Sequence, residues 1–189
     1  MTEKFTVGII VSNHFGVLNR VAGLYAKRGY NIDSLAVGET ENPEYSRMTI
    51  VSTGDEYMKN QVLRQLEKLH DVKMAVLLEK DNSVSIEHML IKLKVGNTEK
   101  ATISDLINDY GGKVMDFGDD FITAEITGSS EKIERLIDAA RATGILEVCR
   151  SGLISMTLGT KDILNVEKSN ECRVGVPPPT AARHATPSL

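Results

Sequence analysis

Val11-Ser12-Asn13-His14-Phe15-Gly16-Val17-Leu18 joins the first strand pattern of this chain to its first helix pattern. Before it, apolar residues alternate over residues 5–11, which is typical of a strand with one buried face. After it, apolar residues recur at helical spacing. Such a turn presents unpaired backbone N–H groups at a helix N-terminus, where the helix dipole favours a small anion. Gly16 lets a ligand approach the backbone closely because it has no Cβ.

A second segment, Arg28-Gly29-Tyr30-Asn31-Ile32-Asp33-Ser34-Leu35, ends this helix pattern and opens the next strand. Asn13 and Asn31 each lie close to a glycine, one in each segment. An amide oxygen can accept from the ammonium group of an amino acid whose carboxylate is held at the helix N-terminus. The alternative is that both asparagines bond only to the local backbone, as turn residues often do.

We favour an amino-acid site, because apolar residues that can surround an aliphatic side chain occur in the same two segments. The candidate residues are Asn13, Gly16, Val17, Leu18, Asn31 and Ile32, with Val11 as a further wall.

The chain repeats one order of patterns after roughly 80 residues. In the first half, strands are expected near 4–11, 31–39, 45–53 and 71–79, and helices near 16–28 and 55–69. In the second half, the expected strands are 89–95, 114–117, 121–126, 145–149 and 153–158, and the expected helices are one that carries the apolar residues of 103–110 and one at 130–142. Each half therefore predicts a βαββαβ unit, and the fold class is α+β with two ferredoxin-like domains.

The predicted domains are residues 1–80 and 81–160, followed by a polar, proline-rich tail at 161–189 that we expect to be flexible. In a βαββαβ unit both helices cover one face of the sheet, and the other face needs a cover. We expect Ile10 and Ile50 on that open face and a second copy of the chain against it, so the chain is expected to form a homodimer.

Composition argues against several classes of partner. A net charge of −4 gives no general attraction to nucleic acid or to an anionic membrane, and no apolar run approaches the length of a membrane span. The two cysteines show no metal-ligand spacing and fit a reducing cytoplasm. No phosphate loop, nucleophile setting or acid–base pair occurs, so no catalytic residue and no metal site are expected.

Several basic residues have two interpretations each. Arg20 falls opposite the apolar stripe of its helix, which favours a solvated role over a ligand contact, and solvent exposure is likewise favoured for His14. Arg47 lies at the start of a strand, where it can serve an interface. The segment Arg150-Ser151-Gly152 interrupts the last strand pattern and indicates either a β-bulge or a contact with a partner.

The two opening segments, together with Ser46-Arg47-Met48-Thr49-Ile50, resemble the regulatory small subunit of acetohydroxyacid (acetolactate) synthase. The first half resembles the ACT domain, an amino-acid-sensing module, and the second half resembles the C-terminal domain of that subunit, including Arg150-Ser151-Gly152. The resemblance spans residues 3–160.

This resemblance implies a subunit without catalytic activity of its own. Such a subunit binds and activates the catalytic subunit, which carries thiamine diphosphate, magnesium and FAD, and confers feedback inhibition by valine or a related branched-chain amino acid. Carried over by position, Asn13, Gly16, Val17 and Leu18 come from one chain, and Asn31 and Ile32 come from the partner chain. Phe15 departs from the proline or serine common in the family, and the tail matches no family feature.

Two other functions remain open at this point. A freestanding ACT-domain sensor that regulates transcription or another enzyme is expected to lack the segments at 28–35 and 46–50. An acylphosphatase-like enzyme shares the topology, but it needs an arginine in the phosphate-binding loop, and residues 12–16 contain none.

Overall fold

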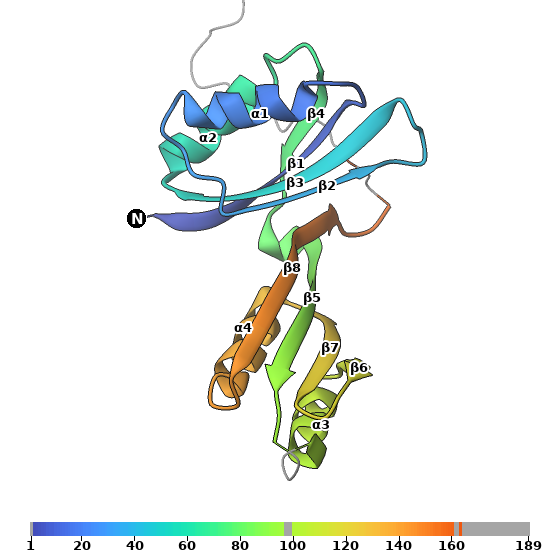
Figure 1. The fold of residues 1–189 in the computed structure, drawn as a ribbon. Helices are drawn as coiled ribbons and strands as arrows, with labels where there is room; N and C mark the ends of the chain where they lie inside the picture. Colours follow the sequence, from blue (N-terminus) through green and yellow to red (C-terminus); the bar gives the residue numbers. More distant parts are fainter. Residues whose placement is uncertain (1, 97–99, 161–162, 164–189) are drawn as a thin grey trace, which may run out of the picture.

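A computed structural model describes residues 2–96, 100–160 and 163 of this chain. The predicted tail at 161–189 lies outside these residues except for Ile163. The chain forms two four-stranded antiparallel sheets, each with two helices on one face (Figure 1). Among the described residues, no helix is long and apolar enough to cross a membrane.

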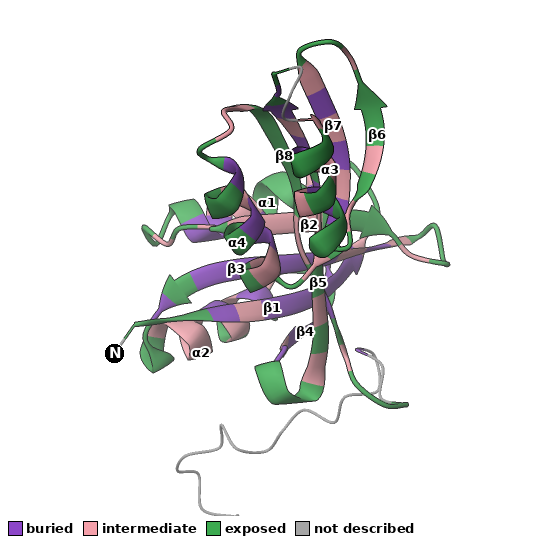
Figure 2. Cartoon of the chain, turned by 90° about the horizontal axis from the view of Figure 1, so that it is seen from below, coloured by how far each residue is buried: buried purple, intermediate pink, exposed green. Residues whose placement is uncertain are grey.

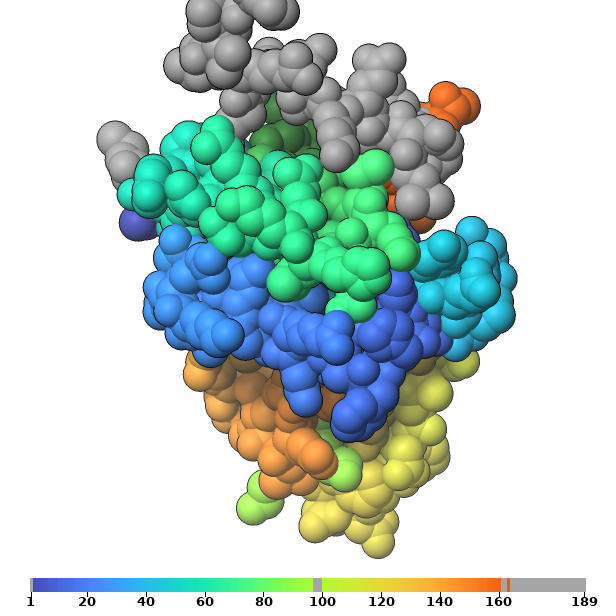
Figure 3. Space-filling view, turned by 90° about the horizontal axis from the view of Figure 1, so that it is seen from above, coloured from blue at the N-terminus to red at the C-terminus, as the bar shows by residue number. Residues whose placement is uncertain are grey.

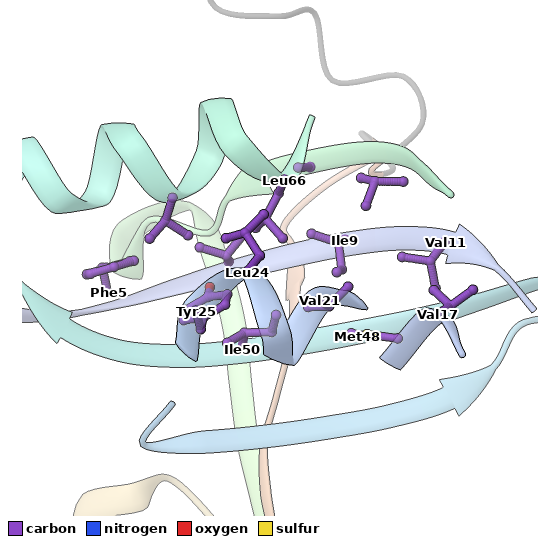
Figure 4. Close-up of a cluster of buried hydrophobic side chains, with 14 residues drawn as sticks. Phe5, Ile9, Val11, Val17, Val21, Leu24, Tyr25, Met48, Ile50 and Leu66 are labelled. Carbon is purple, nitrogen blue, oxygen red and sulfur yellow. The ribbon is translucent and has the colours of Figure 1, made fainter. Parts of the chain in front are cut away.

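The first half contains β1 (Glu3–Ser12), α1 (Val17–Ala26), β2 (Ser34–Glu39), β3 (Tyr45–Gly54), α2 (Glu56–Leu66) and β4 (Val72–Leu77). Its sheet has the order β2-β3-β1-β4, in which the first and last strands of the unit lie side by side. The alternating residues of β1 point into a core shared with both helices (Figure 4). Asp55 caps α2 by accepting a hydrogen bond from the Met58 N–H at 2.8 Å, which explains where that helix begins.

A short 3-10 helix, η1 (Lys80–Asn82), leads into the second half, so the predicted border after residue 80 falls at its start. The second half contains β5 (Ser83–Lys94), α3 (Lys100–Asp109), β6 (Lys113–Phe117), β7 (Phe121–Gly128), α4 (Ser130–Ala140) and β8 (Ile145–Thr157). Its sheet order is β6-β7-β5-β8, the same topology as in the first half. The predicted α+β class with two ferredoxin-like βαββαβ units is therefore confirmed.

Four predicted strand segments differ from the observed strands. The strands predicted at 145–149 and 153–158 are one continuous strand, β8. The strand predicted at 89–95 begins earlier, at Ser83. The strand predicted from 31 begins at Ser34, because residues 31–33 form the connection after α1.

The expected open face of the first sheet needs one correction. Ile50 pairs with Val7, so its side chain lies on the helix-covered face, where it is fully buried. Ile10 does lie on the opposite face, but it is buried against Val76, Leu78 and Ile163. The second half lies beneath this face, and β1 and β3 are buried along most of their length (Figure 2). Much of the cover therefore comes from within the same chain.

Candidate functional site

The turn between β1 and α1 has the backbone geometry that an anion site requires. Gly16 adopts a left-handed conformation with φ of 86°, and no side chain caps the helix that follows it. Within the described residues, the backbone N–H groups of Leu18 and Asn19 have no hydrogen-bond acceptor. A Cβ added at Gly16 would meet nothing within 4 Å, so the space above the turn is open. These donors can therefore bind a small anion from solvent.

The side chains of Asp71, Arg20 and His14 form a hydrogen-bonded group that stabilises this turn. The buried carboxylate of Asp71, just before β4, accepts from the guanidinium of Arg20 and from Nε2 of His14, the latter at 3.1 Å. Its backbone carbonyl accepts from the Ser12 N–H at 2.8 Å. Burial alone would raise the pKa of the Asp71 carboxyl, but Arg20 and His14 outweigh it and lower that pKa. Arg20 and His14 are both exposed, as the sequence favours, and each is in addition a partner of Asp71.

Asn13 connects the turn to the β2–β3 connection. Its side-chain Nδ2 donates to Glu39 Oε2 at 3.0 Å and to the Pro43 carbonyl at 2.9 Å, and its backbone N–H donates to the Glu44 carbonyl at 2.7 Å. The turn and this connection both reach the surface on the face seen in Figure 3. With both amide hydrogens used, the side-chain oxygen of Asn13 is the group left to accept from a ligand.

The apolar candidates separate into two groups. Val11 and Val17 are buried in the core of the first half, so their side chains do not wall a ligand, and the expectation for them is wrong (Figure 4). Val17 can contribute only its backbone. Leu18 is 43% exposed beside the turn, and Ile32 is half buried against the core. Phe15 is 98% exposed at the tip of the turn.

Asn31 lies at the opposite end of α1. Its Nδ2 donates to Asp33 Oδ1 at 2.6 Å, and the other oxygen of that carboxylate accepts from Thr53 Oγ1 at 2.6 Å. A helix of ten residues is roughly 15 Å long, so one chain does not bring Asn31 and Ile32 to the turn at Gly16. The six candidate residues therefore form two separate groups within one protomer.

A cleft of about 1020 Å³ between the two halves was not foreseen from the sequence. It contains a buried carboxylate, Glu87, which accepts from Arg150 through both oxygens at 2.5 and 2.8 Å and from Ser130 Oγ at 3.1 Å. Hydrogen bonding to Arg150 lowers the pKa of Glu87 and, reciprocally, raises the pKa of Arg150. Arg150 also donates to Glu134 of α4 at 2.6 Å.

The signal for this cluster was a charged residue, Glu87, at a core position of the β5 alternation. The predicted bulge is present: Ser151 and Gly152 of β8 lie opposite His88 of β5, where the pairing register shifts. Arg47 serves an interface within the chain, because its Nη2 donates to the Ser155 carbonyl at 2.8 Å. Among the described residues, no group of three histidine, cysteine or carboxylate side chains is placed to hold a metal ion.

Comparisons with known proteins cover both halves. Residues 7–74 match the family described as the AHAS small subunit-like ACT domain, and residues 86–159 match the family described as the small subunit of acetolactate synthase. The acetolactate synthase small subunit of Mycolicibacterium smegmatis is 40% identical over 162 residues, which is 86% of this chain and 95% of that protein.

A probable acetolactate synthase small subunit of Archaeoglobus fulgidus is also 40% identical, over 84% of this chain and 99% of that protein. Among solved structures, the acetolactate synthase small subunit of Thermotoga maritima matches with a TM-score of 0.78 and 32% identity. That match covers 84% of this chain and 99% of the other.

Proposed function

This chain belongs to the family of acetolactate synthase small subunits, and we propose that it is the regulatory subunit of that enzyme. In this role it raises the activity of the catalytic subunit and confers feedback inhibition by valine or another branched-chain amino acid. The observation that carries the proposal is the uncapped, open N-terminus of α1 at Gly16, within a fold whose two halves both match this family.

The backbone N–H groups of Leu18 and Asn19 bind the carboxylate of the effector. They point out of the first turn of α1, the helix dipole adds a partial positive charge there, and the bracing by Asp71 fixes their direction. The side-chain oxygen of Asn13 accepts from the ammonium group, since both of its amide hydrogens are engaged elsewhere.

A second protomer completes the site. The groups at Gly16 and at Asn31 lie at opposite ends of α1, so a ligand that contacts both joins two chains. The partner's Asn31 adds a polar contact, and Leu18 with the partner's Ile32 surrounds the aliphatic side chain. A homodimer of ACT domains is therefore part of the proposal.

The chemistry belongs to the catalytic subunit, which carries thiamine diphosphate, magnesium and FAD. The small subunit acts without a cofactor, in the cytoplasm, by shifting the equilibrium between more and less active states of the complex. A ligand shifts such an equilibrium only through its different affinities for the two states. A coupling of about 1–3 kcal/mol, or roughly 5- to 150-fold, is enough for effective inhibition.

The proposal is tested by calorimetry on the small subunit and by acetolactate formation after reconstitution with its catalytic subunit. Valine, leucine and isoleucine are each titrated into the wild type and into Asn13→Ala and Gly16→Asp. We expect the affinity for the effector to weaken about tenfold or more in both variants. Asn13→Ala removes the hydrogen bond to the ammonium group, and Gly16→Asp places a carboxylate that repels the carboxylate of the effector.

Two controls match these changes. Gly159→Asp alters a glycine that also has positive φ and open space around it, and Asn108→Ala alters an exposed amide on α3. Both controls are expected to bind the effector as the wild type does. A wild type that neither activates the catalytic subunit nor responds to any of the three amino acids would refute the proposed function.

A further inference from the structure

Strands β5 and β8 extend beyond the sheet to which they belong. From Ser83 to Ile86, β5 pairs with β8 alone, because its pairing with β7 begins at Glu87. Residues 83–86 of β5 and 154–157 of β8 therefore form a two-stranded ribbon, which together with the adjoining Leu153 is here called the β5–β8 ribbon. It reaches the open face of the first sheet, beneath β2 and β3 (Figures 1 and 2).

Two hydrogen bonds fix this ribbon to the first half. The backbone N–H of Leu153 donates to Ser34 Oγ, at the start of β2, at 3.0 Å. The guanidinium of Arg47, in β3, donates to the carbonyl of Ser155 at 2.8 Å. Ser155 is almost completely buried, so this contact lies inside the junction.

The same strand is fixed to the second half only three residues before Leu153. Arg150 binds both oxygens of Glu87 and also Glu134 of α4. Between the two anchors lies the bulge, where Gly152 has φ of +75° and approaches β2 closely. A Cβ at Gly152 would lie 2.6 Å from Ser34 Oγ. Only residues 150–153 of β8 therefore separate the contact with Ser34 of β2 from the contact with Glu134 of α4, so a displacement of β2 is expected to displace α4.

The start of β2 is also tied to the proposed effector residues. The side-chain amide of Asn31 donates to the Asp33 carboxylate at 2.6 Å, and this carboxylate also accepts from Thr53 Oγ1. The backbone N–H of Asp33 donates to the Val51 carbonyl at 2.8 Å. Ser34 is the next residue in the chain. An effector that engages the Asn31 amide competes with its bond to Asp33. The position of Ser34 then changes with occupancy of the site.

We propose that the β5–β8 ribbon transmits effector occupancy from the first half to the second, with Ser34 as the positioning residue at the junction. This inference rests on the proposed function and names the contact through which that function operates. The physical basis is that two packed elements joined by directional hydrogen bonds move together, so a small shift at β2 changes the placement of β8 and of the α4 residue bound to it.

The first test is Ser34→Ala in the complex with the catalytic subunit. The variant keeps Asn31, Asp33 and the turn at Gly16, so its affinity for valine in calorimetry is expected to stay within about twofold of wild type. The ratio of activity without valine to activity at saturating valine is expected to fall roughly fivefold. This is the factor by which the loss of one neutral hydrogen bond changes an equilibrium constant, here the one between the more and less active states of the complex.

The second test uses a matched pair of glycine variants. Gly152→Ala and Gly159→Ala introduce the same side chain at φ of +75° and +76°, but only the first meets an atom, Ser34 Oγ, within 3 Å. We expect Gly152→Ala to reduce inhibition and Gly159→Ala to leave it unchanged. In the Ser34→Ala background, Gly152→Ala is expected to add little, because the obstructing oxygen is gone.

A direct readout is hydrogen exchange at the Leu153 amide, which donates to Ser34 Oγ. Its exchange rate is expected to change when valine is added to the wild type, and to be independent of valine in Ser34→Ala. If valine inhibits the wild type and inhibits Ser34→Ala and Gly152→Ala as strongly as it inhibits the wild type, the inference is overturned and the proposed function stands. If the wild type responds to none of the three amino acids, both are overturned.

Discussion

Gly16 is the residue on which the geometry of the β1–α1 turn depends. A left-handed φ costs an L-residue about 1–2 kcal/mol, and the surrounding space is open, so the cost of a substitution is one of backbone conformation alone. We expect Gly16→Ala to lower the free energy of unfolding by about 1–2 kcal/mol in urea denaturation.

Gly23 provides the opposite case inside the same helix. It has ordinary helical geometry, and a Cβ there would meet nothing within 4 Å. Gly23→Ala is therefore expected to raise the free energy of unfolding by about 0.5–1 kcal/mol, since it removes backbone entropy from the unfolded chain. Equal effects of the two variants would show that the turn does not impose the left-handed conformation on Gly16.

Asp71 makes the stability of this turn depend on pH. Its pKa in the folded chain is lowered, so the ion pair with Arg20 and the hydrogen bond from His14 stabilise the fold at pH values above the unfolded pKa of about 3.9. That contribution is lost as the pH falls through the lower, folded pKa. Urea unfolding is expected to show the wild type more stable than Asp71→Asn at pH 7, with a gap that narrows towards pH 3.

The control for Asp71 is Asp138→Asn, which alters an exposed pair between Asp138 of α4 and Arg141, the residue that follows this helix. Exposed pairs contribute little, so its stability is expected to follow the wild type at every pH. A gap for Asp71→Asn that stays constant from pH 7 to pH 3 would show that the buried carboxylate is not the titrating group.

At the level of elements, β8 shows where sequence patterns stop being informative. The polar segment Arg150-Ser151-Gly152 interrupts the apolar pattern, so the sequence predicts two separate strands on either side of it. In the structure the bulge absorbs the interruption, and pairing with β5 resumes on the other side. The helices and most other strands follow the periodic patterns closely, because each buries one face locally, whereas β5 begins six residues before its predicted start and β2 begins three residues after it. The charge of Glu87 at a core position of β5 marks a buried polar contact, but the pattern does not identify Arg150 as its distant partner.

The same segment makes a testable contribution to stability. Arg150→Met leaves the buried carboxylate of Glu87 without its charged partner. Removing one member of a buried pair costs about 3–5 kcal/mol, but the Arg150 side chain is one-third exposed, so solvent reduces the expected loss to about 2–3 kcal/mol. Thermal and urea unfolding of the variant measure this loss.

Two further variants separate charge from shape at this position. Arg150→Lys keeps the charge but cannot bind both oxygens in parallel, so an intermediate loss is expected. Combining Arg150→Met with Glu87→Gln removes the unpaired charge and is expected to recover much of the stability. A double variant as unstable as Arg150→Met alone would show that packing, and not the buried charge, accounts for the effect.

At the scale of the whole molecule, the sequence anticipates the repeated unit but not how the two copies meet. The alternation of β1 predicts the place of Ile10 on the open face of the first sheet correctly, whereas the prediction for Ile50 is wrong because its register with Val7 is a tertiary property. The cover supplied by β8 and Ile163 depends on contacts across more than 100 residues. For the same reason, the sequence does not show that the side chain of Val17 belongs to the core of the first half and not to the ligand site.

The separation of the two candidate groups along α1 leads to a prediction about the proposed dimer. In a two-fold dimer, one site joins Gly16 of the first chain to Asn31 of the second, and the other site joins them in reverse. Mixing Gly16→Asp chains with Asn31→Ala chains therefore yields heterodimers in which one site carries both changes and the other carries neither. Each homodimer has two defective sites.

Heterodimers isolated with two affinity tags are expected to bind one valine per pair of chains with the wild-type affinity, whereas both homodimers bind weakly. Calorimetry measures the stoichiometry and the affinity together, and a double variant Gly16→Asp/Asn31→Ala paired with wild type serves as the control. That control places one change in each site, so no intact site is expected there. If the control binds and the mixed heterodimer does not, the site lies within one chain, and the roughly 15 Å between its parts would have to close by movement of α1 itself.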